Sequence, residues 1–314
     1  MTYEEWLALP EEHESARGYH FLYLYNENKW SWYLRYVRGY RPITTKPALI
    51  EGGVIHSAIE CYLRFGDLEQ AIVTARTLLE QKQDEYTNMD AYKEALSFIP
   101  KMIVNWANKW AIVDKQFYTT IAIEETFDVE LIEGSGITMT IRPDWIVRDS
   151  RDGRVYILDH KSTHYSIPNA AEAVFGQDQS TAYIWGVKKS MPKLADEIVG
   201  VIPDVLYQRG NVYDSQRPGV VVRSEIELFE FEQEAIGLLA ELAAKVCKLD
   251  KYPPHFLFPR NGKDETYFSG GDYYDIYRME LPENTDEYPR GYIIDPSAKT
   301  AINYLKEVAG KLRG

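Results

Sequence analysis

Short runs rich in β-branched and aromatic residues alternate along the chain with longer segments in which apolar residues recur every three to four positions. The first pattern is typical of β-strands and the second of helices. The predicted strands lie at residues 120–127, 136–147, 155–158, 197–202 and 219–222. The predicted helices lie at residues 52–63, 176–187, 232–249 and 298–312, with two or three more expected within 67–113.

Two of the predicted strands are expected to form a β-hairpin. Residues 149–153 between them read Asp-Ser-Arg-Asp-Gly, which is turn composition. Antiparallel pairing would bring Asp144, on the first strand, close to Asp159, at the end of the second. Two hard carboxylate ligands at such a separation suit Mg²⁺ or Mn²⁺. The alternative for an aspartate at a strand end followed by a lysine is a solvated turn or a surface ion pair.

Alternation along the second strand separates the side chains that follow. Asp159 and Lys161 are expected to point to one face and His160 to the other. The lysine would then be directed at whatever the metal holds. A cation there can orient or deprotonate an attacking water, or stabilise charge that develops on a phosphorane-like transition state.

Two of the predicted helices carry polar pairs with a spacing of four residues. His56 and Glu60 share one helix face, and Gln179 and Tyr183 share another. Taken singly, each of these residues also has a purely structural interpretation. His56 would lie at the edge of the core with Glu60 as its partner. Gln179 would be an exposed amide, and Tyr183 a tyrosine at the core edge.

In chain order these residues spell Gly-x-x-x-His-x-x-x-Glu, then Pro-Asp, then Asp-x-Lys, then Gln-x-x-x-Tyr. This order resembles the RecB-like branch of the PD-(D/E)xK nuclease superfamily, over roughly residues 20–280. The resemblance implies an α/β fold with a restriction-endonuclease-like core, in which a central mixed β-sheet is flanked by helices. The chain is also expected to form a single nuclease domain over residues 1–314, with a helical subdomain inserted at 67–113.

The resemblance also implies roles for individual residues. Lys161 would be the catalytic lysine, and Gln179 and Tyr183 would position both the nucleic acid and this lysine. Glu60 matches the acidic position of the first motif. Either Glu124 or Glu125 would serve as an auxiliary acid, and the sequence does not decide between them. The implied metal ligands are His56, Asp144, Asp159 and the backbone carbonyl of His160.

The chain departs from many RecB-like nucleases in its cysteines. Those relatives hold an iron–sulfur cluster with one cysteine near the N-terminal end and three near the C-terminal end. Residues 24–33, 258–262 and 271–277 look like the corresponding segments without their cysteines, and the chain has only Cys61 and Cys247. Two thiolates cannot supply four ligands, so we predict no iron–sulfur cluster. Aromatic packing that includes Trp30 and Trp32 is expected to close that region, and both cysteines are expected to be buried thiols.

Net charge argues against indiscriminate DNA binding, because 35 basic and 48 acidic residues give a formal net charge of −13. Residues 17–46 are an exception, with six basic residues and Glu27 as the only acid. Aromatic residues are interleaved with these charges, a mixture that can hold a phosphate backbone and stack on unpaired bases. The alternative is a helix with buried aromatics and solvated charges. The candidate DNA-binding residues here are Trp30, Arg35, Arg38 and Arg41, to which Gln179 and Tyr183 add.

From these observations we predict an Mg²⁺- or Mn²⁺-dependent deoxyribonuclease, acting as an exonuclease on single-stranded DNA or strand ends in recombination or repair. A helicase or recombination protein is a possible partner. Two alternatives stay open: a catalytically silent nucleic-acid-binding or assembly subunit, and a structure- or sequence-specific endonuclease. The sequence has no apolar run that could span a bilayer and no signal-peptide pattern, so a cytoplasmic location is expected.

Overall fold

The computed structural model describes residues 2–8, 17–43, 45–86, 88–164, 168, 175, 178–259, 292–295 and 298–313. The chain divides into two compact units. The first unit consists of Met1–Glu12, Thr44–Phe127 and Ile141–Phe229, and the second of His13–Ile43, Asp128–Thr140 and Glu230–Gly314.

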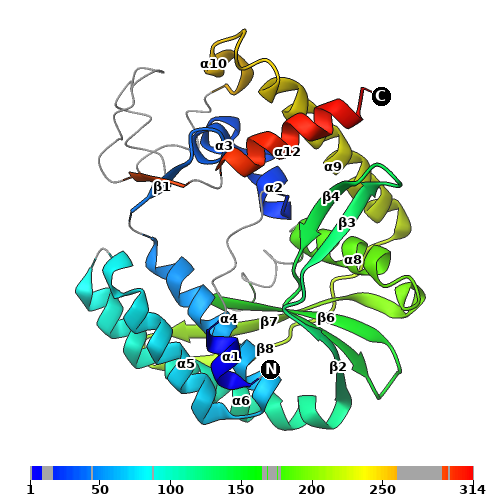
Figure 1. Ribbon diagram of the computed structural model, residues 1–314. Helices are drawn as coiled ribbons and strands as arrows, with labels where there is room; N and C mark the ends of the chain where they lie inside the picture. Colours follow the sequence, from blue (N-terminus) through cyan, green and yellow to red (C-terminus); the bar gives the residue numbers. More distant parts are fainter. Residues whose placement is uncertain are drawn as a thin grey trace. The chain divides into compact units, whose positions relative to one another are not determined.

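A five-stranded sheet forms the centre of the first unit (Figure 1). Its strands, in spatial order, are β2 (Tyr118–Ile123), β5 (Trp145–Asp149), β6 (Val155–Thr163), β7 (Ile198–Arg209) and β8 (Val212–Gln216). The pair β6–β7 is parallel, and the other neighbouring pairs are antiparallel. The structure therefore confirms the expected central mixed sheet, and it confirms the β-hairpin as β5–β6.

Helices accompany this sheet in the first unit, and local signals set their ends. The α4 helix has Pro47 in its first turn and ends at Gly66, whose φ of 72° suits a glycine C-cap. Asp67 and Asn88 cap α5 and α6 through their side-chain oxygens. The helical elements are α1 (Tyr3–Leu7), α4 (Pro47–Phe65), α5 (Leu68–Gln81), η1 (Gln83–Glu85), α6 (Met89–Phe117), α8 (Asp178–Ser190) and η2 (Ala195–Glu197).

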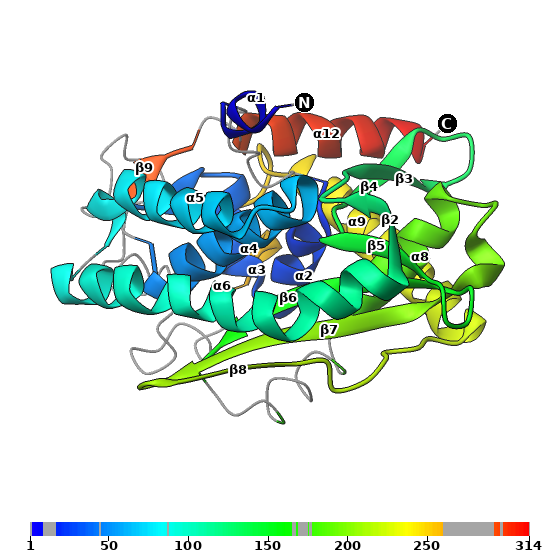
Figure 2. The same ribbon diagram turned by 90° about the horizontal axis from the view of Figure 1, so that it is seen from below.

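Opposite faces of the sheet meet different helices. Lys161 on β6 donates a hydrogen bond to Gln179 of α8, whereas the ring of His160 lies edge-on to Trp106 of α6, with 6.0 Å between ring centroids. Because neighbouring residues of a strand point to opposite faces, α8 covers one face and α6 the other. Figure 2 shows α6 running along β7 and β8. The range expected to form a helical subdomain corresponds to α5, η1 and α6, which pack in the same unit as the sheet.

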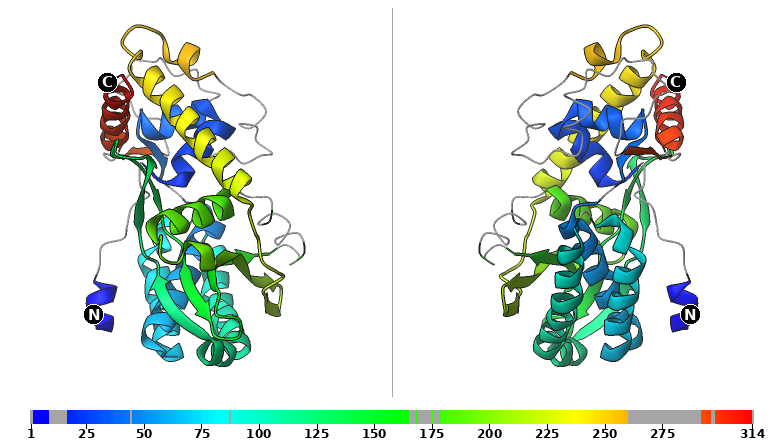
Figure 3. Two further views of the ribbon diagram at one scale, coloured as in Figure 1. Left: turned by 90° about the vertical axis from the view of Figure 1, so that its right-hand side faces the viewer. Right: turned by 90° about the vertical axis from the view of Figure 1, so that its left-hand side faces the viewer.

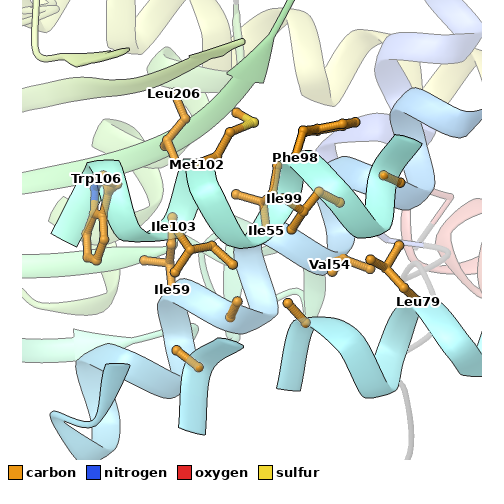
Figure 4. Packing of buried hydrophobic residues seen from close by; sticks show 14 of the residues in the cluster. Val54, Ile55, Ile59, Leu79, Phe98, Ile99, Met102, Ile103, Trp106 and Leu206 are labelled. Carbon is orange, nitrogen blue, oxygen red and sulfur yellow. The ribbon is translucent and has the colours of Figure 1, made fainter. Parts of the chain in front are cut away.

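An apolar core joins α4, α5 and α6 (Figure 4). Ile55 and Ile59 of α4 pack with Ile99 and Ile103 of α6, and all four side chains are almost completely buried. Leu206 of β7 belongs to the same cluster. This packing holds α4 in a fixed position relative to the sheet, which matters because α4 carries His56.

The second unit contains mainly helices. Figure 3 shows α9 as a long yellow helix beside the blue helices α2 and α3, and Glu241 of α9 accepts a hydrogen bond from Tyr25 of α2 at 2.6 Å. Its described strands form two two-stranded sheets, β3–β4 and the antiparallel pair β1–β9. The elements are α2 (Tyr19–Glu27), α3 (Lys29–Tyr36), β1 (Tyr40–Pro42), β3 (Phe127–Ile132), β4 (Ile137–Ile141), α9 (Glu225–Val246), α10 (Pro254–Leu257), β9 (Tyr292–Ile294) and α12 (Ala298–Lys311), of which β3, β4 and α9 reach into the first unit.

Aromatic rings fill the core of the second unit where residues 24–33 meet Phe258. Phe258 is completely buried and stacks on Trp32 and Tyr33, with centroid separations of 5.5 and 5.4 Å. Tyr25 adds an edge-to-face contact with Trp32. The aromatic packing predicted for residues 24–33 and 258 is thus present, while residues 260–277 lie outside the described part of the chain.

Several expected boundaries were wrong. Residues 137–141 form β4, which pairs with β3 and not with β6, and Asp144 lies in the short irregular segment before β5. Parallel pairing with β7 extends β6 to Thr163, so Asp159 is not at its end. Residues 219–222 form no strand and contribute only the bridge between Val221 and Val201, whereas β8 was not predicted.

Two further sequence expectations concern cysteines and membranes. Cys61 is buried and Cys247 is half-buried, and both are free thiols. Among the described residues, no helix is both long and apolar enough to cross a lipid bilayer.

Candidate active site

Two elements of the first unit, α4 and β6, contact the carboxylate of Asp144. The α4 helix brings His56, whose Nδ1 lies 3.5 Å from Oδ2 of Asp144. The β6 strand brings the backbone N–H of His160, which donates a hydrogen bond to the same oxygen at 2.6 Å. Asp144 itself is only 5% exposed. Its carboxylate is therefore held in one orientation from two sides.

Glu124 completes a group of possible metal ligands. It follows β2 in the left-handed region, with a φ of 48°, and its N–H donates to the Asp144 carbonyl at 2.9 Å. One ligand atom each from His56, Glu124 and Asp144 lie within 4.8 Å of one another. Glu125 is exposed. Of these two glutamates, Glu124 belongs to the group of possible metal ligands and Glu125 does not.

The charges around this group are those expected of a cation site. Burial, followed by the charge of Asp144, raises the pKa of Glu124 to about 9. Burial also raises the pKa of Asp159, with a further contribution from Asp144. Burial lowers the pKa of His56, which favours the neutral imidazole that metal binding requires. Crowded carboxylates beside a neutral histidine fit a divalent metal such as Mg²⁺ or Mn²⁺.

Lys161 takes part in a second series of hydrogen bonds, on the face of β6 that packs against α8. Its Nζ donates to Oδ1 of Asp159 at 2.9 Å and to Oε1 of Gln179 at 3.0 Å. The Gln179 amide nitrogen in turn donates to the Tyr183 hydroxyl at 2.9 Å. The i,i+4 pair of α8 thus fixes the lysine beside Asp159. Burial would lower the pKa of Lys161, but the charges of Asp159 and Asp144 raise it above the ordinary value.

Glu60 has other partners. Its Oε1 accepts hydrogen bonds from the Arg64 side chain at 2.7 Å and from the Trp6 indole at 3.1 Å. The Arg64 guanidinium also donates to the Ile123 carbonyl, at the end of β2. Glu60 therefore lies in an ion pair that ties α4 to β2, close to Glu124.

The candidate DNA-binding residues between Trp30 and Arg41 lie in the second unit. Trp30 is buried and stacks on Tyr33, with 5.0 Å between ring centroids. Arg38 donates to the Tyr40 hydroxyl at 2.7 Å, and Arg41 pairs with Asp295. Arg35 lies over the ring of Tyr36. The indole of Trp30 consequently presents little surface for base stacking.

The raised pKa of Glu124 predicts how the metal-free protein responds to pH. Glu124 binds its proton more tightly in the folded state than in the unfolded chain. The protonated carboxyl therefore contributes its full stabilisation at pH values below its pKa in the unfolded chain, and this contribution is lost as pH rises toward 9. In EDTA, the free energy of unfolding should fall between pH 5 and 9 with a slope approaching about 1.4 kcal/mol per pH unit from this group. Urea unfolding of wild type and Glu124→Gln at several pH values measures this slope.

The Gln variant retains the shape of the side chain but cannot titrate, so the other ionisable groups cancel in the comparison. Its stability should be less dependent on pH than that of wild type. Identical pH profiles for the two proteins would show that Glu124 is not the group responsible.

Comparison with known proteins provides one finding. The family described as the PD-(D/E)XK nuclease superfamily matches residues 21–254, which is most of the chain. The matched range contains every residue discussed around Asp144 and Lys161 except Trp6. No curated protein sequence matches the chain significantly.

Proposed function

Because the chain belongs to the PD-(D/E)XK nuclease superfamily, we propose that it is a deoxyribonuclease that uses Mg²⁺ or Mn²⁺ to hydrolyse phosphodiester bonds. The observation that carries the proposal is the placement of Asp144, Asp159 and Lys161 around the β5–β6 hairpin, with His56 and Glu124 beside them. Here Pro143-Asp144 and Asp159-His160-Lys161 supply the family's motif.

The proposed division of roles follows from the contacts. His56, Glu124 and Asp144 would hold the metal, joined by Asp159 and the His160 carbonyl. When bound, such an ion activates water and polarises a phosphoryl oxygen. Lys161 carries a positive charge that stabilises the negative charge developing on the scissile phosphate. Gln179 accepts a hydrogen bond from the ammonium group and donates one to Tyr183, so the two residues together keep the ammonium group from rotating away.

The proposal extends to substrate and setting through the order of motifs, which is that of RecB-like nucleases. We propose digestion of single-stranded DNA or strand ends during cytoplasmic recombination or repair, with delivery by a helicase or recombination protein. The cations at Arg35, Arg38 and Arg41 would contact the phosphate backbone. An overall charge of −13 favours such local capture of a strand over general adhesion to duplex.

A digestion experiment tests both reaction and substrate. End-labelled linear single-stranded DNA and a circular single strand of the same sequence are incubated with the protein and Mn²⁺, with EDTA as the control. We expect the linear strand to be degraded at least about tenfold faster than the circle, and no degradation in EDTA, because the reaction needs an end and a metal.

Other outcomes separate the alternatives. Equal cleavage of circle and line would identify an endonuclease. Specific DNA binding with no cleavage of either strand would identify a catalytically silent subunit and contradict the proposal. Faster degradation of a matched RNA strand would contradict the assignment to DNA.

A further inference from the structure

A network of buried charged groups lies on the face of the sheet opposite to Lys161. Asp204 of β7 is completely buried and accepts hydrogen bonds from the Trp106 indole at 2.8 Å and from Nη2 of Arg217 at 2.9 Å. Arg217, whose side chain is 7% exposed, also binds both carboxylate oxygens of Asp114 on α6. This network is outside the set of residues that the sequence singled out.

The network reaches the active site through His160. His160 and Asp204 are direct neighbours in the parallel pairing of β6 with β7, and Nδ1 of His160 lies 3.3 Å from Oδ2 of Asp204. The imidazole ring is 2% exposed and lies edge-on to Trp106. The same residue donates its backbone N–H to Asp144. His160 therefore contacts Asp204 with its ring and Asp144 with its peptide group.

Stability alone does not account for such an arrangement. Removing several ionisable groups from water is costly, and well-packed apolar residues of similar volume often stabilise a core as well or better. Buried polar groups of this kind do fix geometry, because each hydrogen bond restricts where its partner can lie. The network lies against the His160 ring, whose Nδ1 is 3.3 Å from Asp204 and whose edge meets Trp106.

We propose that Asp204, Arg217 and Trp106 are positioning residues for the metal site. By holding the His160 ring they fix the backbone of this residue, whose N–H orients the Asp144 carboxylate and whose carbonyl is a proposed ligand. The inference rests on the proposed function, since it assumes that a divalent metal binds at Asp144. Mutation of residues that contact and orient metal ligands commonly changes metal affinity by about 10- to 100-fold.

Calorimetric titration with Mn²⁺ tests the inference without relying on catalysis. Trp106→Phe removes the indole donor to Asp204, and Arg217→Lys removes the planar pair of donors to Asp204 and Asp114. Each variant should bind Mn²⁺ about 10-fold or more weakly than wild type. In cleavage assays the Mn²⁺ concentration for half-maximal rate should rise by a similar factor, while the rate at saturating Mn²⁺ recovers to near the wild-type value.

Arg151→Lys is the matched control. Arg151 pairs with the buried carboxylate of Asp149 at the β5–β6 turn of the same sheet, without contact to His160. This variant should keep wild-type Mn²⁺ affinity. Melting temperatures, measured for all four proteins, allow each titration to be made well below unfolding.

The outcomes distinguish this inference from the proposed function. Wild-type affinity in both Trp106→Phe and Arg217→Lys would overturn the positioning role and leave the nuclease proposal intact. Loss of affinity in Arg151→Lys equal to that in Arg217→Lys would also overturn it, because the effect would then follow general loosening of the sheet. Absence of Mn²⁺ binding by wild type would overturn both proposals.

Discussion

Lys161→Met should lower the DNA cleavage rate by about 100- to 1,000-fold, the usual cost of removing one preorganised group that stabilises transition-state charge. Methionine has a similar length but no charge, so the scissile phosphate would lose its nearby ammonium. Mn²⁺ affinity should be retained, because Lys161 contacts Asp159 and Gln179 and is not itself a ligand. Rates measured at saturating Mn²⁺, together with calorimetric titration, separate these two effects.

Lys188→Met is a suitable control for this change. Lys188 lies on α8 and pairs with Glu225 at 2.6 Å, and its side chain is 21% exposed, compared with 25% for Lys161. The control should cleave DNA at the wild-type rate. A Lys161→Met protein that retained wild-type activity would remove Lys161 from the mechanism and leave the metal site as the sole catalytic element.

Asp144→Asn should eliminate measurable Mn²⁺ binding and lower cleavage by at least about 1,000-fold, since a bound metal contributes several kcal/mol to transition-state stabilisation. The amide has nearly the same shape as the carboxylate but no charge, and it offers one oxygen instead of two. Folding should survive. The side-chain oxygen of asparagine can still accept the hydrogen bond that the His160 N–H donates to Asp144. Mn²⁺ titration, cleavage assays and thermal melting in EDTA measure the three effects.

Asp149→Asn provides the comparison for Asp144→Asn. Asp149 lies at the other end of β5, is 4% exposed, and pairs with Arg151 at the turn. We expect it to lose stability through the broken ion pair but to keep Mn²⁺ affinity. If Asp144→Asn bound Mn²⁺ as tightly as Asp149→Asn does, the metal would have to lie elsewhere in the protein.

Short-range patterns in the sequence predicted much of this site. A period of two placed Asp159 and Lys161 on one face of β6 and His160 on the other, and the contacts to Gln179 and Asp204 agree. A helical period placed Gln179 and Tyr183 together, and they are hydrogen-bonded. Such predictions succeed because strand and helix geometry are local properties of the chain.

Local sequence patterns did not predict the features that depend on long-range contacts or on irregular backbone conformation. The choice of Glu124 over Glu125 depends on a left-handed backbone conformation after β2, which has no periodic signal. The β8 strand reads Val-Tyr-Asp-Ser-Gln, with too little apolar alternation to indicate a strand. By contrast, Val220 to Val222 has strand composition but forms a single bridge, because the backbone of Val221 crosses directly over Gly200.

The scattered origin of the ligands has a consequence for folding. The proposed ligands His56, Glu124, Asp144 and Asp159 come from segments separated along the chain, so they meet only after loops have closed and the non-local β6–β7 pair has formed. Partly folded chains should therefore lack affinity for Mn²⁺. A metal that binds only the native state adds about 2.7 kcal/mol to its stability at 100 times the dissociation constant. Mn²⁺ binding during refolding would thus report the moment when native topology is complete.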